Sequence, residues 1–207
     1  VDIVTAIVFQ PVFSTLGPND SAETVDQETL DKVQNLKGLS LAIESVIGLS
    51  EESKHEQIVA SSDPLGKLAE AFVTGLHRVL VRFPGKVGLR NVSQTDVLRF
   101  IQANAKDGLV APVLRKTLEE LGLGLPRKLT VARCDQTALS NYRKLLINDV
   151  QAAPIVDAEG GLLGTLSLSD LRGVLHEGPG WSAALLLPVT EFVVKARADT
   201  PYVTVTR

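Results

Sequence analysis

The sequence has a single cysteine and no methionine in 207 residues. Cys134 cannot form a disulfide within the chain, so we expect a reducing compartment, cytoplasmic or nuclear. A chain of this length normally contains several methionines, and here even position 1 is a valine. The ends also fall within predicted elements rather than between them. Both features are typical of a piece of a longer protein or of a chain from which residues are missing.

The sequence also lacks a surplus of basic residues and any long apolar run. Lys and Arg number 21 against 24 Asp and Glu, which gives a net charge of −3. This balance provides no electrostatic footprint for nucleic acid or for acidic membranes. The longest apolar runs, such as 183–189, are much shorter than the roughly 20 residues of a membrane-spanning helix. We therefore expect neither nucleic acid nor a membrane among the partners.

One local pattern occurs twice in the chain. Residues 86–98 and 161–172 each predict an apolar strand, then Ser-x-x-Asp, then an amphipathic helix. The two aspartates, Asp96 and Asp170, are 74 residues apart. That spacing is too long for a solenoid repeat and suits a small α/β half-domain. The pattern places a hydroxyl and a carboxylate together at a strand–helix junction in each copy.

The elements around each copy follow one order: strand, helix, strand, strand, helix. In the first copy the expected ranges are 57–60, 63–75, 77–83, 87–92 and 94–103. In the second copy they are 129–132, 135–146, 153–157, 162–166 and 169–175. Asp63 and Asp135 are expected to cap the first helix of each copy, and Pro64 to follow its cap. The helix of the first copy is expected to bury a stripe made of Leu65, Leu68, Phe72 and Val73.

The segments outside the two copies carry weaker signals. The expected elements are a helix or strand over 2–13, a polar loop over 18–28, a weakly periodic helix over 36–49, a charged linker over 51–56, helices over 112–121 and 189–196, and a strand over 202–206.

The residues of both copies resemble a known family. The second copy has Ala153-Pro-Ile-Val-Asp157, then Glu159-Gly, then Gly164-Thr-Leu-Ser-Leu-Ser-Asp170. This order of strand, turn, strand and helix resembles the cystathionine-β-synthase (CBS) domain family. The first copy, with Leu76-His-Arg-Val-Leu-Val81 and Leu89-Arg-Asn-Val-Ser-Gln-Thr-Asp96, is similar to the gamma subunits of AMP-activated and plant sucrose-non-fermenting-related kinases. Together the copies cover about half of the chain.

The resemblance implies a mixed α/β (α+β) fold with two β-α-β-β-α half-domains. In the family, two such motifs pack as a pseudo-twofold pair, the Bateman module. The implied division is an N-terminal extension over 1–54, a first motif over 55–104, a linker over 105–126, a second motif over 127–177 and a C-terminal extension over 178–207. Gamma subunits carry four copies, so the extensions would hold the tail of a preceding copy and the opening strand of a following one.

Each Ser-x-x-Asp sequence has two interpretations. Ser93 with Asp96, and Ser167 with Asp170, match a capping box, in which serine and an acidic residue three positions later stabilise the start of a helix. The resemblance implies instead that each aspartate binds the ribose hydroxyls of a nucleotide, with the serine and the helix-start amides facing sugar or phosphate.

Three further residues are candidates for nucleotide contact. His77 and Arg78 open a strand, which is a common surface arrangement. In kinase gamma subunits a His-Arg pair at this position contacts phosphate, and arginine offers a planar fork for it. The second copy has Gln151-Ala-Ala-Pro there and lacks the cations. Thr130, in the opening strand of the second copy, is a further candidate, although a β-branched residue needs no such role in a strand.

The sequence shows no nucleophile–base pair, no metal cluster and no acid–base couple, so we expect no enzyme activity. The first hypothesis is an energy-sensing regulatory module that binds AMP, ADP, ATP or, less favoured, S-adenosylmethionine between the motifs. Its partner would be a kinase catalytic or scaffold subunit, or a second copy in a homodimer. The alternatives are a CBS pair without ligand that serves as a docking or oligomerisation module, and the regulatory part of a larger enzyme or transporter.

Overall fold

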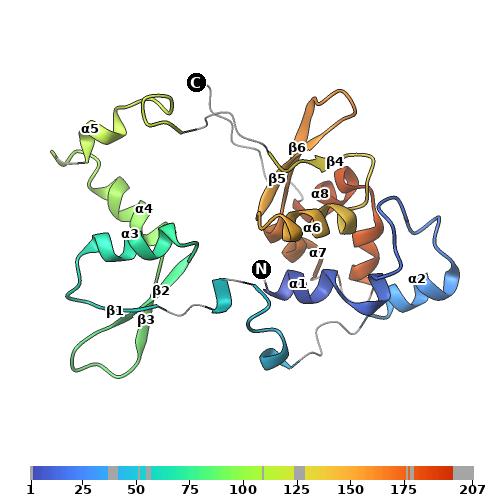
Figure 1. The fold of residues 1–207 in the computed structure, drawn as a ribbon, viewed down its shortest axis with the longest axis horizontal. Helices are drawn as coiled ribbons and strands as arrows, with labels where there is room; N and C mark the ends of the chain where they lie inside the picture. Colours follow the sequence, from blue (N-terminus) through green and yellow to red (C-terminus); the bar gives the residue numbers. More distant parts are fainter. Residues whose placement is uncertain are drawn as a thin grey trace. The chain divides into compact units, whose positions relative to one another are not determined.

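The computed structural model describes residues 2–36, 42–50, 52–54, 57–108, 110–123, 129–175, 177 and 180–197. Contacts divide the chain into two compact units. The first-motif unit comprises the described residues between 47 and 126. The second-motif unit comprises the described residues between 1 and 46 and between 127 and 205. Figure 1 labels the helices and strands of both units.

The first-motif unit has the expected order of elements. They are β1 (Ile58–Ala60), α3 (Leu65–Val73), β2 (Arg78–Arg82), β3 (Leu89–Ser93) and α4 (Gln94–Ala103). The sheet order is β1-β2-β3, with β1 and β2 parallel and β2 and β3 antiparallel. A parallel pair requires a crossover, which α3 supplies, whereas the antiparallel pair needs only the turn between β2 and β3. The mixed α/β prediction is confirmed here.

The core of the first-motif unit is small. Val79 and Val81 alternate inward along β2 and pack with Val59. On α3 the expected buried stripe is partly wrong, because Ala71 is the buried residue and Leu65 and Val73 are exposed. The expected cap is also wrong. Asp63 accepts a hydrogen bond from the Ala60 N–H at 2.9 Å instead, and the helix begins at Leu65 after Pro64.

The second-motif unit repeats the same order of elements. They are β4 (Ala132–Arg133), α6 (Ala138–Ile147), β5 (Ala152–Val156), β6 (Leu162–Ser167), the 3-10 turn η4 (Leu168–Asp170) and α7 (Leu171–Leu175). The pairing is again parallel and then antiparallel, in the order β4-β5-β6. The cap of α6 differs from the prediction: Thr137 accepts from the Ser140 N–H, while Asp135 pairs with Arg133.

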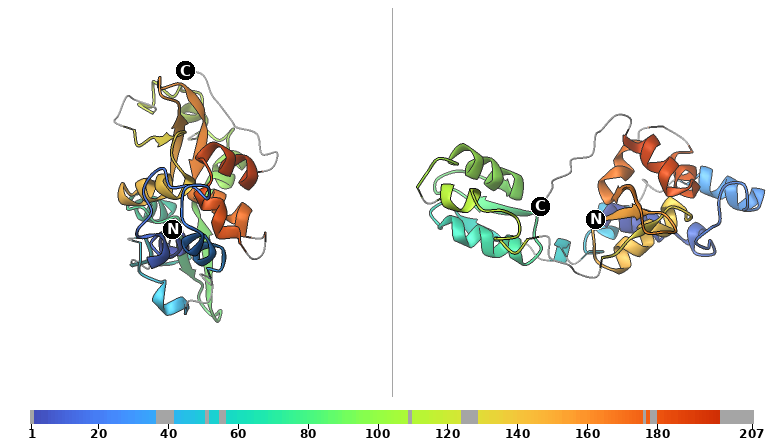
Figure 2. Two further views of the ribbon diagram at one scale, coloured as in Figure 1. Left: turned by 90° about the vertical axis from the view of Figure 1, so that its right-hand side faces the viewer. Right: turned by 90° about the horizontal axis from the view of Figure 1, so that it is seen from above.

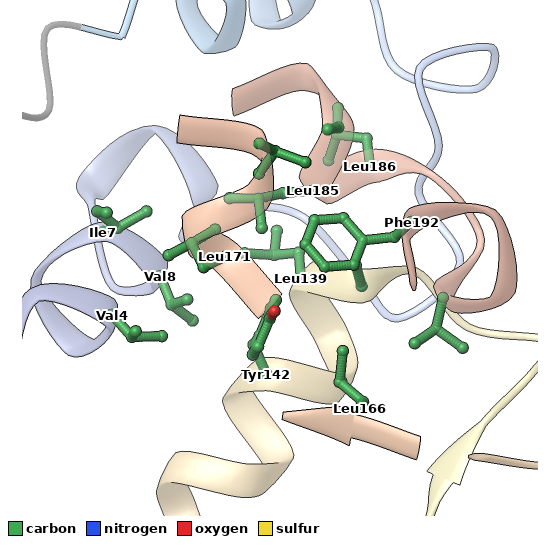
Figure 3. Close-up of a cluster of buried hydrophobic side chains, with 14 of the residues drawn as sticks. Val4, Ile7, Val8, Leu139, Tyr142, Leu166, Leu171, Leu185, Leu186 and Phe192 are labelled. Atoms are coloured by element: carbon green, nitrogen blue, oxygen red, sulfur yellow. The ribbon is translucent and has the colours of Figure 1, made fainter. Parts of the chain in front are cut away.

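Segments from both ends of the chain complete the second-motif unit. They are α1 (Asp2–Val8), the 3-10 turn η1 (Pro11–Phe13), α2 (Gln27–Gln34), the 3-10 turn η5 (Trp181–Leu186) and α8 (Val189–Arg197). Residues of α1 join one large core with α6, α7, η5 and α8 (Figure 3). The Thr137 N–H donates to the Pro18 carbonyl at 3.1 Å, and the Arg143 guanidinium donates to the carbonyls of Phe13 and Leu16. Residues 2–36 are therefore part of the second-motif unit.

The remaining described elements are short. They are η2 (Ile43–Ser45), η3 (Glu52–Lys54) and α5 (Ala111–Leu114). The helix expected over 112–121 is thus wrong beyond its first turn, and the described part of 36–49 holds one 3-10 turn rather than a helix. The strand expected over 202–206 lies outside the described residues. None of the described helices has both the length and the apolar character needed to cross a bilayer.

Helices α7 and α8 pack against each other in the second-motif unit (Figure 2). Their backbones come closest at a glycine of α7. A Cβ atom added to Gly173 would lie 1.8 Å from the carbonyl oxygen of Ala196. This is far inside van der Waals contact, and the obstacle is backbone rather than a flexible side chain. Any larger residue at position 173 must therefore push the two helices apart.

We predict that Gly173→Ala destabilises the second-motif unit by about 1–3 kcal/mol, as overpacking does elsewhere. Trp181, the single tryptophan, is buried in this unit and reports its unfolding by fluorescence in urea. Gly66→Ala is the matched control, because Gly66 lies in α3 of the other unit with open space around it. Equal Trp181 transitions for the two variants would contradict the close approach.

Candidate functional site

The pairing of β2 with β3 brings four predicted site residues to one end of the first sheet. Arg78 at the start of β2 is directly opposite Ser93 at the end of β3. The Gln94 N–H donates to the His77 carbonyl at 3.2 Å, which fixes the start of α4 beside the start of β2. Asp96 follows in the first turn of that helix. We call His77, Arg78, Ser93, Gln94 and Asp96 the first corner.

Asp96 forms a capping box with Ser93, as one of the two sequence interpretations predicts. Its Oδ2 accepts from the Ser93 N–H at 2.9 Å and from the Ser93 hydroxyl at 2.7 Å, and the Asp96 N–H donates to the Ser93 Oγ at 3.3 Å. The hydrogen bond from the Ser93 N–H holds the pKa of the Asp96 carboxyl below its usual range. The side chain is 48% exposed, and among the described residues its Oδ1 pairs with Arg99 at 3.2 Å. Asp96 is therefore an ionised carboxylate with one oxygen on the solvent side.

The two predicted cation positions differ in exposure. Arg78 is exposed, whereas His77 is half-buried. Because Val79 and Val81 face the core, Arg78 and Arg82 lie on the opposite face of β2. Arg78 thus reaches solvent on the face away from the core, at the end of the sheet that carries the first corner.

The second motif has a corner of the same topology. Ala152 is opposite Ser167, and the Leu168 N–H donates to the Gln151 carbonyl at 2.9 Å. We call Gln151, Ala152, Ser167, Leu168 and Asp170 the second corner. Ser167 and Asp170 again form a capping box, with the Ser167 N–H 2.8 Å from Asp170 Oδ2. The Tyr142 hydroxyl donates to the Ser167 carbonyl at 3.2 Å, and burial, with the nearby charge of Asp170, raises the pKa of this phenol.

The surroundings of Asp170 differ from those of Asp96. Asp170 is buried, and the guanidinium of Arg197 binds it with both arms: Nε lies 2.8 Å from Oδ1 and Nη2 lies 2.7 Å from Oδ2. Arg197 Nη1 also donates to the Thr165 hydroxyl at 3.2 Å. Arg197 is not among the site residues that the sequence predicts. Its only signal was a basic residue at the end of a predicted helix, and nothing local connects it to a carboxylate 27 residues earlier.

Thr130 lies two residues before β4 and is half-buried, so it precedes the strand in which it was predicted.

A hollow of about 620 Å³ lies at the other end of the first sheet, between Ala60 at the end of β1 and the β2–β3 turn at Lys86. It includes no residue of the first corner. No group of three or more potential metal-ligating side chains occurs within the described part of the chain. The nucleotide contacts assigned to the seven candidate residues remain predictions.

No protein-family model matches the chain. Two curated fungal proteins are similar to it. Protein SDS23 of Yarrowia lipolytica is 28% identical over 163 residues, which is 76% of this chain and 32% of that protein. Protein sds23/moc1 of Schizosaccharomyces pombe is 30% identical over 112 residues, which is 53% of this chain and 27% of that protein. The chain thus spans about a third or less of the length of these relatives.

Solved structures similar to this chain, at TM-scores between 0.24 and 0.45, include several CBS-domain proteins and one conserved protein whose name states no family. A conserved protein from Pyrococcus horikoshii is 20% identical with a TM-score of 0.45, covering 68% of this chain and 65% of its own. CBSX2 in complex with AMP is 24% identical with a TM-score of 0.25, covering 60% of this chain and 90% of its own. The CBS pair of protein MJ0100, in complex with methylthioadenosine and S-adenosylmethionine, is 16% identical with a TM-score of 0.24, covering 57% and 90%. At these scores the likeness adds nothing to the topology described above. By their own strand order and pairing, both units have the CBS-type β-α-β-β-α fold that the sequence predicts, with one motif in each.

Proposed function

We propose that the chain is a non-catalytic regulatory module whose first corner binds an adenosine nucleotide. The observation that carries the proposal is the pairing of Arg78 with Ser93, which places a cation beside a hydroxyl and a carboxylate. These are the groups that bind a phosphate and a pair of sugar hydroxyls. The adenosine part of the proposal follows from the sequence resemblance alone.

Each group of the first corner has a distinct task in this proposal. Asp96 Oδ1 accepts hydrogen bonds from ribose hydroxyls in place of its exposed contact with Arg99. Oδ2 stays in the capping box and keeps the carboxylate oriented. Arg78 and His77 bind phosphate, aided by the positive end of α4, which follows directly.

The regulatory part of the proposal concerns α4. This helix begins at the first corner and carries two exposed apolar side chains, Leu98 and Phe100, which are 64% and 54% exposed. A nucleotide that binds the start of α4 can favour one of two arrangements of this helix and so change the surface that a protein partner contacts. The shift between the two arrangements cannot exceed the difference in the nucleotide's binding free energy for them. The resemblance to gamma subunits suggests a cytoplasmic or nuclear kinase subunit as that partner, and a second copy of this chain is the other candidate.

A docking module without ligand is the second candidate function. Two observations favour it: the capping box already uses one oxygen of Asp96, and Asp170 is occupied by Arg197. In that case the exposed residues of α4 would serve an interface alone. Titration with AMP, ADP, ATP and S-adenosylmethionine separates the two candidates, since a ligand that binds the folded chain raises its melting temperature as its concentration grows. The absence of a shift with all four would support the docking module.

We predict that Asp96→Asn weakens AMP binding about tenfold to a hundredfold, because a hydrogen bond to a charged acceptor is lost while asparagine keeps an oxygen for the capping box. Asp63→Asn is the matched control. Asp63 also accepts a main-chain N–H and pairs with a lysine, but it lies at the other end of the sheet. Isothermal titration calorimetry measures the AMP affinity of both variants. Equal affinities for the two variants would contradict the ribose role of Asp96.

We predict that Arg78→Ala weakens AMP binding about tenfold and leaves S-adenosylmethionine binding unchanged, since the latter carries adenosine without phosphate. Arg82→Ala is the matched control, because Arg82 is an exposed arginine on the same face of β2, four residues away at the other end. If Arg78→Ala weakened both ligands equally, or if Arg82→Ala had the larger effect, the phosphate role of Arg78 would be wrong.

A further inference from the structure

The two corners share one topology, yet their carboxylates have different neighbours. Asp96 is 48% exposed and pairs with Arg99 of its own helix, whose side chain is 72% exposed. Asp170 is 7% exposed and pairs with Arg197 from another helix, whose side chain is 18% exposed. One corner is therefore open to solvent at its carboxylate, and the other is filled by a guanidinium.

We infer that Arg197 is the internal ligand of the second corner: it occupies the carboxylate of Asp170 in place of an external hydroxyl ligand. A consequence, which rests on the function proposed above, is that nucleotide binding is confined to the first corner. Arg197 would then determine which of the two motifs responds to a nucleotide.

The hydrogen bonds of Asp170 leave little room for a ligand. Oδ1 accepts from Arg197 Nε, and Oδ2 accepts from both Arg197 Nη2 and the Ser167 N–H. A bidentate arginine–carboxylate pair is among the stronger hydrogen-bonded pairs in proteins. A ribose could bind Asp170 only by displacing this pair, which would leave a largely buried guanidinium without its carboxylate. Losing one partner of a buried ion pair is far more costly than losing an exposed one.

The packing of α8 against the core of the second-motif unit determines where Arg197 lies. Phe192 and Val193 of α8 are buried in the core of the second-motif unit. The ring of Phe192 meets that of Tyr142 edge to face, with 5.5 Å between the ring centres. Lys195 pairs with Glu177 at 2.7 Å, two residues before the end of the helix. Helix α8 thus presents Arg197 to the second corner.

One sequence difference explains why only the second corner is filled in this way. The residue three positions after the aspartate is Arg99 in the first motif and Gly173 in the second. Gly173 is the residue at which the backbone of Ala196 comes too close for any Cβ. A helix placed like α8 could therefore not approach the first corner as closely, because Arg99 has a side chain where the second motif has none.

The ion pair is tested without any nucleotide by a double-mutant cycle in urea, followed by Trp181 fluorescence. We expect Arg197→Gln and Asp170→Asn each to raise the unfolding equilibrium constant at least tenfold. The double variant should be at least tenfold more stable than the two separate effects would predict. Arg172→Gln, an exposed arginine of α7, is the matched control and should show no coupling with Asp170→Asn. Additive effects of Arg197→Gln and Asp170→Asn would overturn the inference.

The confinement to one motif is tested by calorimetric titration with AMP. We expect one molecule per chain, a loss of affinity of at least tenfold in Asp96→Asn, and a change of less than twofold in Asp170→Asn. If Asp170→Asn weakened AMP binding as much as Asp96→Asn, nucleotide binding would not be confined to the first corner. If the wild-type chain bound no AMP, the proposed function would fail and the confinement with it. The double-mutant cycle would still decide whether Arg197 is the ligand of Asp170.

Discussion

The register of two antiparallel strand pairs is the constraint on which the account depends. Arg78 is opposite Ser93 in the first sheet, and Ala152 is opposite Ser167 in the second. A shift of one residue would turn every side chain of the strand to the other face, and the buried valines of β2 resist such a shift. The register therefore places the start of β2 beside the start of α4, and the start of β5 beside the start of η4. Ser-x-x-Asp and the residues that open β2 or β5 become neighbours for that reason alone.

The same topology has given two chemically different corners. In the first motif, the hydrophobic core is small and leaves α4 and Asp96 exposed, so the carboxylate keeps a solvent-facing oxygen. In the second motif, segments from both ends of the chain build a larger core, and α8 brings a guanidinium onto the equivalent carboxylate. A capping box is present in both, so the local sequence pattern serves helix stability in each copy whether or not a ligand binds.

Local patterns predicted the motif elements well. The bounds of α4 agree with the prediction, and the turns and strand order of both copies follow from alternation and from Pro and Gly positions. The predicted caps were wrong, because Asp63 accepts from the Ala60 N–H before α3, and Thr137 rather than Asp135 caps α6. The sequence could not predict the contacts of Arg143 with Phe13 or of Arg197 with Asp170. Those pairs join distant segments, and no spacing or periodicity connects them.

The most direct test of the central claim, that the first corner is open and the second is filled, is to follow backbone amide resonances while AMP is added. The account predicts that the amides of His77, Arg78, Ser93 and Asp96 shift progressively and saturate, while those of Ser167 and Asp170 stay in place. Shifts centred on Ser167 and Asp170, with the first corner unchanged, would contradict it.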